Sequence, residues 1–232
     1  MNSFQFQSAD RINISKLIEA KQAVWPQENC DPQNIAQTLN SPHHHTAVWM
    51  EDGRVAAFVD GFLTADLQGQ PRWEVDLLGT RPEYRGRGLA RALIEDSLVA
   101  GFQRGARFAR ALIQVENAAS QRAFAACGFC QTPATWRLWV CADPLREEVN
   151  LPRGQALVAV QTINYQGVWL EGELSKEGLL SARAWLSGRQ GQICGVLIPI
   201  QRADLHAAAQ SAGYELVDDY HWWLCDHPSE TV

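Results

Sequence analysis

Apolar and polar positions follow two different periods along the chain, and together they predict a mixture of helices and strands. Residues 10–22 carry apolar side chains near helical spacing, and residues 32–39 start at a proline, which suits the first turn of a helix. Two apolar runs, 46–50 and 55–63, flank an Asp-Gly pair at 52–53, and such a pair predicts a β-hairpin. The chain is therefore expected to place helices ahead of a hairpin.

Strands and helices are predicted to alternate after the hairpin. The helix that starts near residue 88 places Leu89, Leu93 and Leu98 on one stripe, as an amphipathic helix does. Gly128 is a typical C-terminal stop for the helix before it. Apart from the hairpin, the expected elements up to residue 141 are strands at 4–7, 73–80, 108–115 and 136–141 and helices at 88–103 and 118–127.

A second series of elements follows a charged, proline-containing linker predicted at residues 145–153. Its expected elements are strands at 156–162, 167–173, 193–200 and 215–225 and helices at 176–186 and 203–212. Residues 207–214 resemble residues 123–129, which indicates a weak internal duplication with a period of about 85 residues. We expect one domain at 1–144 and a smaller, degenerate copy of it at 154–232.

Composition and charge narrow the class of protein. Hydrophobic residues make up 46% of the chain and charged residues 20%, which is ordinary for a globular protein with a sizeable core. A net charge of -6 and an isoelectric point near 5.5 disfavour nucleic acids and anionic membranes as partners, because both attract basic surfaces.

The N-terminus and the cysteines favour a cytoplasmic location. Residues 1–6 have neither the basic region nor the apolar core of a signal peptide, and no segment reaches the roughly 18 apolar residues of a membrane helix. The six cysteines are scattered, and the Cys127-x-x-Cys130 pair has no second pair nearby to complete a zinc site. Reduced, structural thiols are expected.

The loop at residues 80–90 carries the clearest chemistry in the sequence. It follows a predicted strand and presents Gly86 and Gly88, where the backbone can approach a ligand closely. The next helix points its free N–H groups and the positive end of its dipole into the loop, which suits a phosphate or pyrophosphate. Arg85 and Arg87 add guanidinium donors for phosphate oxygens.

Two common phosphate-binding loops do not match this segment. A Walker A loop ends in Gly-Lys-Ser or Gly-Lys-Thr, which is missing here. A dinucleotide-binding loop needs a third glycine, and Arg91 stands at that position. On these residues alone, a basic turn that caps a surface helix stays open as an alternative.

The surroundings of the loop resemble the GNAT superfamily of N-acetyltransferases over residues 3–141. The family's Q/R-x-x-G-x-G/A signature and its downstream continuation are met at Arg85, Gly88, Ala90, Asn117, Gly128 and Phe129. The resemblance implies an α/β fold with a mixed sheet, of the GNAT acyltransferase type. A smaller GNAT-like C-terminal unit would follow it, and this unit would complete the fold or shape the acceptor pocket.

The resemblance also implies how acetyl-CoA, the expected co-substrate, is held. The pantetheine arm would bond to the backbone of the strand at 78–80, where an N–H would also polarise the thioester carbonyl. The pyrophosphate would take the N–H groups of 85–90. The implied coenzyme-binding residues are Leu78, Gly79, Thr80, Arg85, Gly86, Arg87, Gly88, Leu89, Ala90, Asn117, Ser120 and Phe124.

Attack of an amine on the thioester is helped by a general base, and the predicted strand at 73–80 offers two acids. By the period of two, Glu74 and Asp76 share one face with Leu78 and Thr80. Glu74 is the first choice, because some family members carry a base glutamate at this distance before the loop. Asp76 is the second, and either can act through a water. Alternatively, both acids are solvated or bind a cationic substrate.

Phe124 departs from the family pattern. Many members carry a tyrosine there that protonates the leaving thiolate, so the acid that protonates the thiolate stays unassigned.

We expect an enzyme that acetylates an amine of a small molecule or peptide. A non-catalytic acyl-CoA-binding sensor is the alternative, a dimerisation module on an inactive fold is a third reading, and a homodimer stays open.

One further segment is not expected to bind pyrophosphate and another is not expected to bind a metal, although the second stays a candidate for lining the acceptor site. Residues 174–179, which correspond to the loop in the second half, contain one glycine and no arginine pair, so no pyrophosphate site is expected there. His43, His44 and His45 are adjacent, and neighbours in a strand point to opposite faces, so we expect no metal site.

Overall fold

The computed structural model describes residues 5–8, 13–28, 30–147 and 149–227. The first series of elements is β1 (Gln5–Ser8), α1 (Ile14–Val24), α2 (Pro32–Leu39), β2 (His44–Glu51), β3 (Arg54–Ala65), β4 (Pro71–Thr80), a 3-10 turn (Pro82–Tyr84), α3 (Leu89–Gln103), β5 (Phe108–Gln114), α4 (Ala118–Ala125) and β6 (Cys130–Cys141). The second series is β7 (Gln155–Gln161), β8 (Gln166–Gly172), α5 (Lys176–Trp185), β9 (Ile193–Pro199), α6 (Ala203–Ser211) and β10 (Glu215–Asp226).

The predicted helices and strands are present, with ends that shift by a few residues. The largest difference is β6, which begins at Cys130 rather than at residue 136. Residue 4 of the first predicted strand and residues 10–12 of the first predicted helix lie outside the described residues. The predicted Asp-Gly hairpin is confirmed, because Asp52 and Gly53 have φ of 49° and 74°, as a two-residue turn of type I′ requires.

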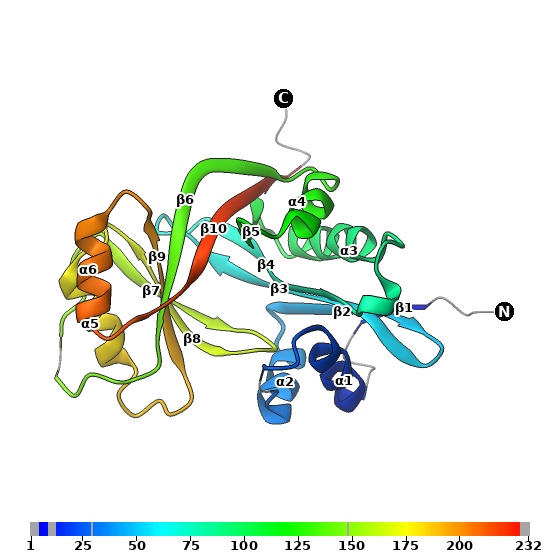
Figure 1. Ribbon diagram of the computed structural model, residues 1–232, viewed down its shortest axis with the longest axis horizontal. Coiled ribbons are helices and arrows are strands. Elements are labelled where there is room, and N and C mark those ends of the chain that lie inside the picture. The colour runs from blue at the N-terminus through cyan, green and yellow to red at the C-terminus, as the bar shows by residue number, and fades with distance from the viewer. Residues whose placement is uncertain (1–4, 9–12, 29, 148, 228–232) are drawn as a thin grey trace.

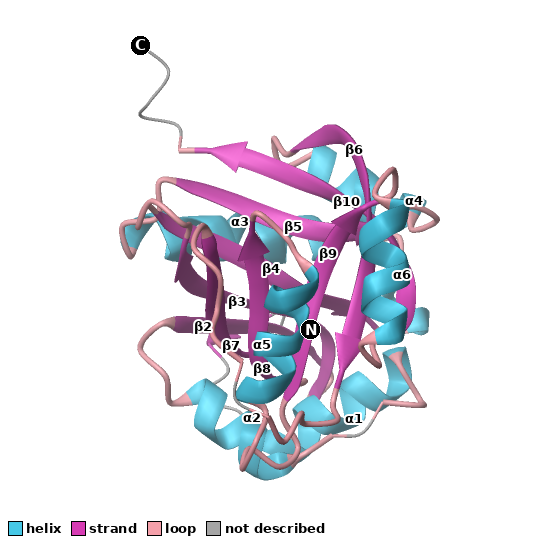
Figure 2. Ribbon diagram, turned by 90° about the vertical axis from the view of Figure 1, so that its left-hand side faces the viewer, coloured by secondary structure: helices cyan, strands magenta, loops and turns pink. Residues whose placement is uncertain are grey.

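The strands form one curled mixed sheet in the order β1-β2-β3-β4-β5-β10-β6-β9-β8-β7 (Figure 1, Figure 2). Two neighbouring pairs are parallel, β4 with β5 and β8 with β9. From β3 to β6 and from β7 to β10 the chain runs through the same order of strand, strand, helix, strand, helix, strand. The fold class expected from the sequence, a mixed sheet with helices, is confirmed.

The last strands of the two series exchange places. β10 pairs with β5 of the first series, and β6 pairs with β9 of the second series. β6 and β10 also pair with each other, so they run as two long strands through the middle of the molecule (Figure 1). The predicted linker at residues 145–153 lies between β6 and β7, and the division into two domains stays a prediction.

Helices cover both faces of the first half of the sheet. α3 and α4 lie on one face, where Trp73 is fully buried, and α1 and α2 lie on the other, over a core that contains Leu17 (Figure 1). α5 and α6 close a third core around Leu179 in the second half. Within the described residues, no helix has the length and apolar character that crossing a membrane would require.

Candidate active site

β4 and β5 run side by side for only a short distance. Their ladder begins at the pair Arg72–Phe108 and ends at the pair Glu74–Arg110. β4 continues to Thr80 along β3, while β5 continues along β10. Past Glu74, the facing edges of these two described strands have no ladder between them. Their backbone N–H and C=O groups therefore border a slot that suits an extended ligand.

A β-bulge interrupts β4 beside this slot. The register with β3 shifts by one residue after Val75, which leaves Asp76 without an opposite residue. Val75, before the bulge, and Leu78, after it, both pack in the core that contains α3. The expectation that Leu78 and Thr80 share a face with Glu74 is therefore wrong, because the extra residue reverses the alternation of side chains.

The loop before α3 has the geometry of an anion-binding site. Gly86 and Gly88 have φ of 77° and 78°, the left-handed region that favours glycine, and open space surrounds both. Gly88 is the N-cap of α3 and has no side chain with which to cap it. The first helical hydrogen bond here runs from the Ala92 N–H to the Gly88 carbonyl. The N–H groups of the first turn are thus available to a ligand.

The two arginines of the loop differ in their surroundings. Arg85 is exposed, and its Nε donates to the Thr80 carbonyl at 3.3 Å. Arg87 Nη1 donates to both carboxylate oxygens of Glu51, at 2.9 and 3.1 Å, and its guanidinium lies 5.2 Å from the centre of the Tyr84 ring. Arg85 is the better placed of the two to turn toward a phosphate, whereas Arg87 fastens the loop to β2.

α4 begins directly after β5, at the open end of the slot. Asn117 is its N-cap, and the Asn117 Oδ1 accepts the Ser120 N–H at 3.1 Å. Phe124 is buried and packs edge-on against Phe129, with ring centres 4.9 Å apart. Asn117 therefore lies at an exposed helix end, while Phe124 lies in the core; their contacts with the coenzyme stay predictions.

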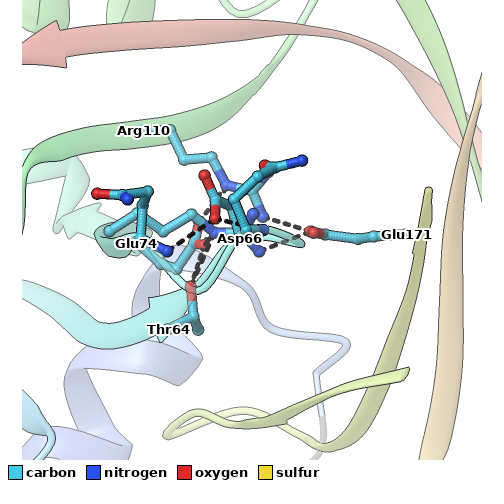
Figure 3. A network of polar contacts seen from close by, with 8 residues as sticks. Thr64, Asp66, Glu74, Arg110 and Glu171 are labelled. Atoms are coloured by element: carbon cyan, nitrogen blue, oxygen red, sulfur yellow. Dashed lines mark hydrogen bonds and ion pairs between the residues drawn. The ribbon is translucent and has the colours of Figure 1, made fainter. Parts of the chain in front are cut away.

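Glu74 is held in a buried network of ion pairs (Figure 3). Its Oε1 accepts from Thr64 Oγ1 at 2.6 Å and from Arg72 Nε at 2.8 Å. Its Oε2 accepts from Arg110 Nε at 2.7 Å. From β8, Glu171 Oε1 accepts from Nη2 of both arginines at 2.7 Å. Two carboxylates thus balance two guanidinium groups, and both oxygens of Glu74 are engaged.

Asp76 has different surroundings. It is half-buried, and its Oδ1 accepts a hydrogen bond from the Tyr165 hydroxyl at 3.3 Å. Burial, followed by the negative charges of Asp60 and Glu74, raises the pKa of Asp76 to about 7. Burial and the charge of Asp76 raise the pKa of Tyr165 well above its usual range, so its hydroxyl keeps its proton at neutral pH.

A cavity of about 510 Å3 lies at the deep end of the slot. Asp76 and Arg110 contribute to it from β4 and β5, and β6 and β10 supply further wall. The rest comes from the second half, including Tyr165, Trp169 and Glu171. The volume falls within the range of small-molecule sites.

The turn between β7 and β8 carries Tyr165 into the first half. The Thr162 carbonyl accepts from Asn34 Nδ2 at 2.9 Å, and the Ile163 carbonyl accepts from the buried Lys21 Nζ at 2.9 Å. These bonds tie the turn to α1 and α2. No local sequence signal marks Tyr165 as part of the site, because its contact with Asp76 joins residues 89 positions apart.

The three adjacent histidines do not gather around one point. His45 Nε2 lies 2.6 Å from Asp96 Oδ2 of α3, whereas His44 stacks on Phe62 of β3 with ring centres 5.1 Å apart. His43 is exposed. Among the described residues, no group of three or more His, Cys, Asp or Glu side chains could hold a metal ion.

The curled sheet, the slot between parallel strands and the open helix N-terminus together define an α/β protein whose glycine loop leaves the start of α3 uncapped. Residues 13–129, about half of the chain, match the model of the acetyltransferase (GNAT) family. The chain therefore belongs to this family, and it is an acyltransferase.

Several solved structures share the fold of this chain, whereas no curated protein matches the chain by sequence. A tandem GNAT protein from the clavulanic acid biosynthesis pathway is 13% identical, with 98% of this chain and 100% of that chain covered and a TM-score of 0.60. A GCN5-related N-acetyltransferase from Sphaerobacter thermophilus is 13% identical, with coverage of 96% and 95% and a TM-score of 0.58. An aminoglycoside N-acetyltransferase, AAC(6')-Iy, in complex with CoA is 21% identical, with coverage of 57% and 91% and a TM-score of 0.51.

Proposed function

We propose that the protein is an N-acetyltransferase that moves an acetyl group from acetyl-CoA to an amine of a small molecule or peptide. The observation that carries this proposal is that the edge of β4 beyond Glu74 has no ladder to β5 and leads from Asp76 to the strand end before the Gly86–Gly88 loop. A pyrophosphate at the loop, an extended arm along this edge and a thioester near Asp76 would follow in that order.

The residues of this edge and of the loop fit the chemistry of coenzyme A. The first-turn N–H groups of α3 and the Arg85 guanidinium would take the pyrophosphate. The backbone of β4 from Leu78 to Thr80 would bond to the amide groups of the arm, as a neighbouring strand would. Next to the bulge, a β4 N–H would polarise the thioester carbonyl and stabilise negative charge on its oxygen.

Asp76 is the general base in this proposal, in preference to Glu74. Both Glu74 oxygens already accept from buried guanidinium groups, so a proton on Glu74 would break the network of ion pairs. Asp76 accepts one hydrogen bond from Tyr165, and its pKa of about 7 is close to neutral pH, which suits a proton acceptor. Asp76 would act directly or through a water.

The proposed reaction is a direct transfer without a covalent enzyme intermediate. The amine nitrogen bonds to the thioester carbonyl carbon and passes a proton to Asp76. The carbon–sulfur bond then breaks with its electron pair on sulfur, and the thiolate takes a proton from solvent to leave as free coenzyme A. The products are an amide and a thiol.

A product assay tests the proposal. The protein is incubated with acetyl-CoA and a panel of small amines and peptides, and mass spectrometry then detects an amine that has gained one acetyl group. We expect at least one acetylated product, with free thiol released in equal amount. Coenzyme binding without any acetylated product would instead favour the acyl-CoA sensor.

A further inference from the structure

We propose that the cavity beside Asp76 selects a small monoamine whose amino group is attached to an apolar, preferably aromatic, body. This inference rests on the proposed function, because it names the acceptor of the same reaction. It follows from the walls of the cavity, the charges that those walls offer, and the place of the carboxylate.

The walls of the cavity are mainly apolar and aromatic. Five aromatic side chains from both halves line it while staying half-buried: Trp136, Tyr165, Trp169, Tyr220 and Trp222. Leu138 of β6 lines the cavity with them and is half-buried too. An apolar acceptor body would remove this surface from water, which favours binding by about 25 cal/mol per Å2 covered.

The charged groups of the wall mostly satisfy one another. Of the wall residues, Glu74, Arg110 and Glu171 form the balanced network of ion pairs together with Arg72, and the Arg110 guanidinium also lies 4.0 Å from the centre of the Trp222 ring. This network presents no net charge to a ligand. A sugar or a polyamine would lose hydrogen bonds to water here without matching partners, which is unfavourable.

Asp76 is the exception, and it matches one ammonium group. Its carboxylate lines the cavity and accepts a hydrogen bond from the Tyr165 hydroxyl at 3.3 Å, so it can also accept from an ammonium group. The buried amine of Lys21 is already engaged, because it donates to the Ile163 carbonyl and to the Asn164 side chain. One carboxylate in an apolar chamber therefore fits one amine on an apolar body, and the same carboxylate is the base of the proposed reaction.

The test compares how efficiently different amines are acetylated when acetyl-CoA is supplied equally to each. The panel is 2-phenylethylamine, hexylamine, spermidine, glucosamine and a short peptide, with kcat/KM measured for each. We expect 2-phenylethylamine to exceed spermidine and glucosamine by at least about tenfold, as apolar contacts of one or two methylene groups already give such ratios. Faster transfer to spermidine, glucosamine or the peptide would overturn the inference but leave the proposed function intact.

Variants of the cavity wall test whether the cavity is the source of the preference for an apolar amine. With 2-phenylethylamine as the acceptor, Leu138→Asn is expected to raise KM by about tenfold, because it places a polar group in the apolar wall, while the affinity for acetyl-CoA stays the same. Leu67→Asn, in the exposed turn between β3 and β4, is the matched control and should change neither value. If Leu138→Asn lowers stability, Leu138→Ala is used, and it should shift preference toward a larger aryl amine.

An acyl chain is the rival occupant of the cavity. If the chamber holds the acyl group rather than the amine, octanoyl-CoA should be a better donor than acetyl-CoA, and Leu138→Asn should remove that advantage. That result would overturn the inference. No binding of any acyl-CoA, measured by calorimetry, would show that the proposed function itself has failed.

Discussion

The N-termini of α3 and α5 occupy equivalent places in the two series of elements, yet only one of them is open. α3 follows Gly88, which has left-handed φ and no side chain to cap the helix. α5 follows Ser175, whose hydroxyl accepts the Gly178 N–H at 3.2 Å. An uncapped helix end leaves N–H groups for an anion, whereas a capped one has already used one of them.

A second side chain fills the space at α5. Gln155 Nε2 donates to the Glu173 carbonyl and to Ser175 Oγ. A Cβ built on Gly178 would lie only 1.8 Å from Gln155 Oε1, so that side chain sits directly against the helix end. A Cβ on Gly88 would have no neighbour within 4 Å. The two series have the same order of elements, but the N-terminus of α3 is open because its loop has no side-chain cap, whereas the side chains of Ser175 and Gln155 occupy the N-terminus of α5.

The largest expected effect comes from closing the open helix end. Arg85→Ala with Gly88→Glu removes a phosphate donor and places a carboxylate where the pyrophosphate would lie. We expect the Kd for acetyl-CoA, measured by calorimetry, to rise by at least about 100-fold, the loss of two charge-assisted contacts. Arg153→Ala with Gly69→Glu makes the same chemical changes at exposed positions outside the loop and should leave Kd unchanged.

The next effect concerns Asp76, where the two halves meet. Asp76→Asn should lower kcat by about 100-fold, because the amide cannot take a proton. In the wild type, activity should fall as pH drops through about 7, the pKa at which Asp76 becomes protonated. Asp226→Asn, at the exposed end of β10, serves as control and should keep kcat. An unchanged kcat in Asp76→Asn would remove Asp76 as the base.

The same variant has an opposite effect on stability. The pKa of Asp76 is about 7 in the folded protein and 3.8 ordinarily, so the folded state holds this proton more tightly than the unfolded state. The free energy of unfolding is therefore highest below pH 4, and it falls as pH rises through 7. Asparagine does not ionise. Compared with the wild type, Asp76→Asn should therefore gain about 2–3 kcal/mol more unfolding free energy at pH 8 than at pH 5 in urea titrations. If the difference in unfolding free energy between the variant and the wild type did not change with pH, the raised pKa of Asp76 would be contradicted.

A smaller effect separates backbone strain from ligand contact. Gly88→Ala and Gly69→Ala both add a Cβ at a φ of 78° with no neighbour within 4 Å, so each should lower the unfolding free energy by about 1–2 kcal/mol. Only Gly88→Ala should also weaken acetyl-CoA binding, by about tenfold, because its Cβ would lie in the loop that takes the pyrophosphate. Equal affinities in the two variants would place the coenzyme elsewhere.

The smallest effect compares two helix caps. Asn117→Ala and Ser175→Ala each remove a side-chain cap and should each lower the unfolding free energy by about 1 kcal/mol. Asn117→Ala should also weaken acetyl-CoA binding a few-fold, and Ser175→Ala should not. A loss of affinity in Ser175→Ala would indicate a coenzyme site at α5.

Local patterns predicted most of the fold. The hairpin at Asp52-Gly53 and the glycine loop before α3 were readable because their residue types permit conformations that others avoid. The exchange of β6 and β10 could not be predicted from the sequence. Strand neighbours are set by the packing of segments far apart in the chain, and both strands have a similar aromatic and apolar pattern whichever neighbours they join.

The site was predicted less completely than the fold. The bulge at Asp76 has no glycine or proline to mark it, so the period of two carried past it and misplaced Leu78. The environment of Glu74 depends on Arg110 and Glu171 from two other strands, and no local pattern brings these together. The glycine loop, in contrast, is continuous in sequence, so its open backbone could be predicted from its residue types, while its role in coenzyme binding stays a prediction.

The number of acetyl-CoA molecules bound per chain tests the central claim most directly. Isothermal titration calorimetry of the wild-type protein should give one molecule per chain, and the Arg85→Ala, Gly88→Glu variant should give no measurable binding in the same concentration range. Two molecules per chain, or one molecule that persists in the variant, would contradict the account, because the coenzyme would then bind outside the open end of α3.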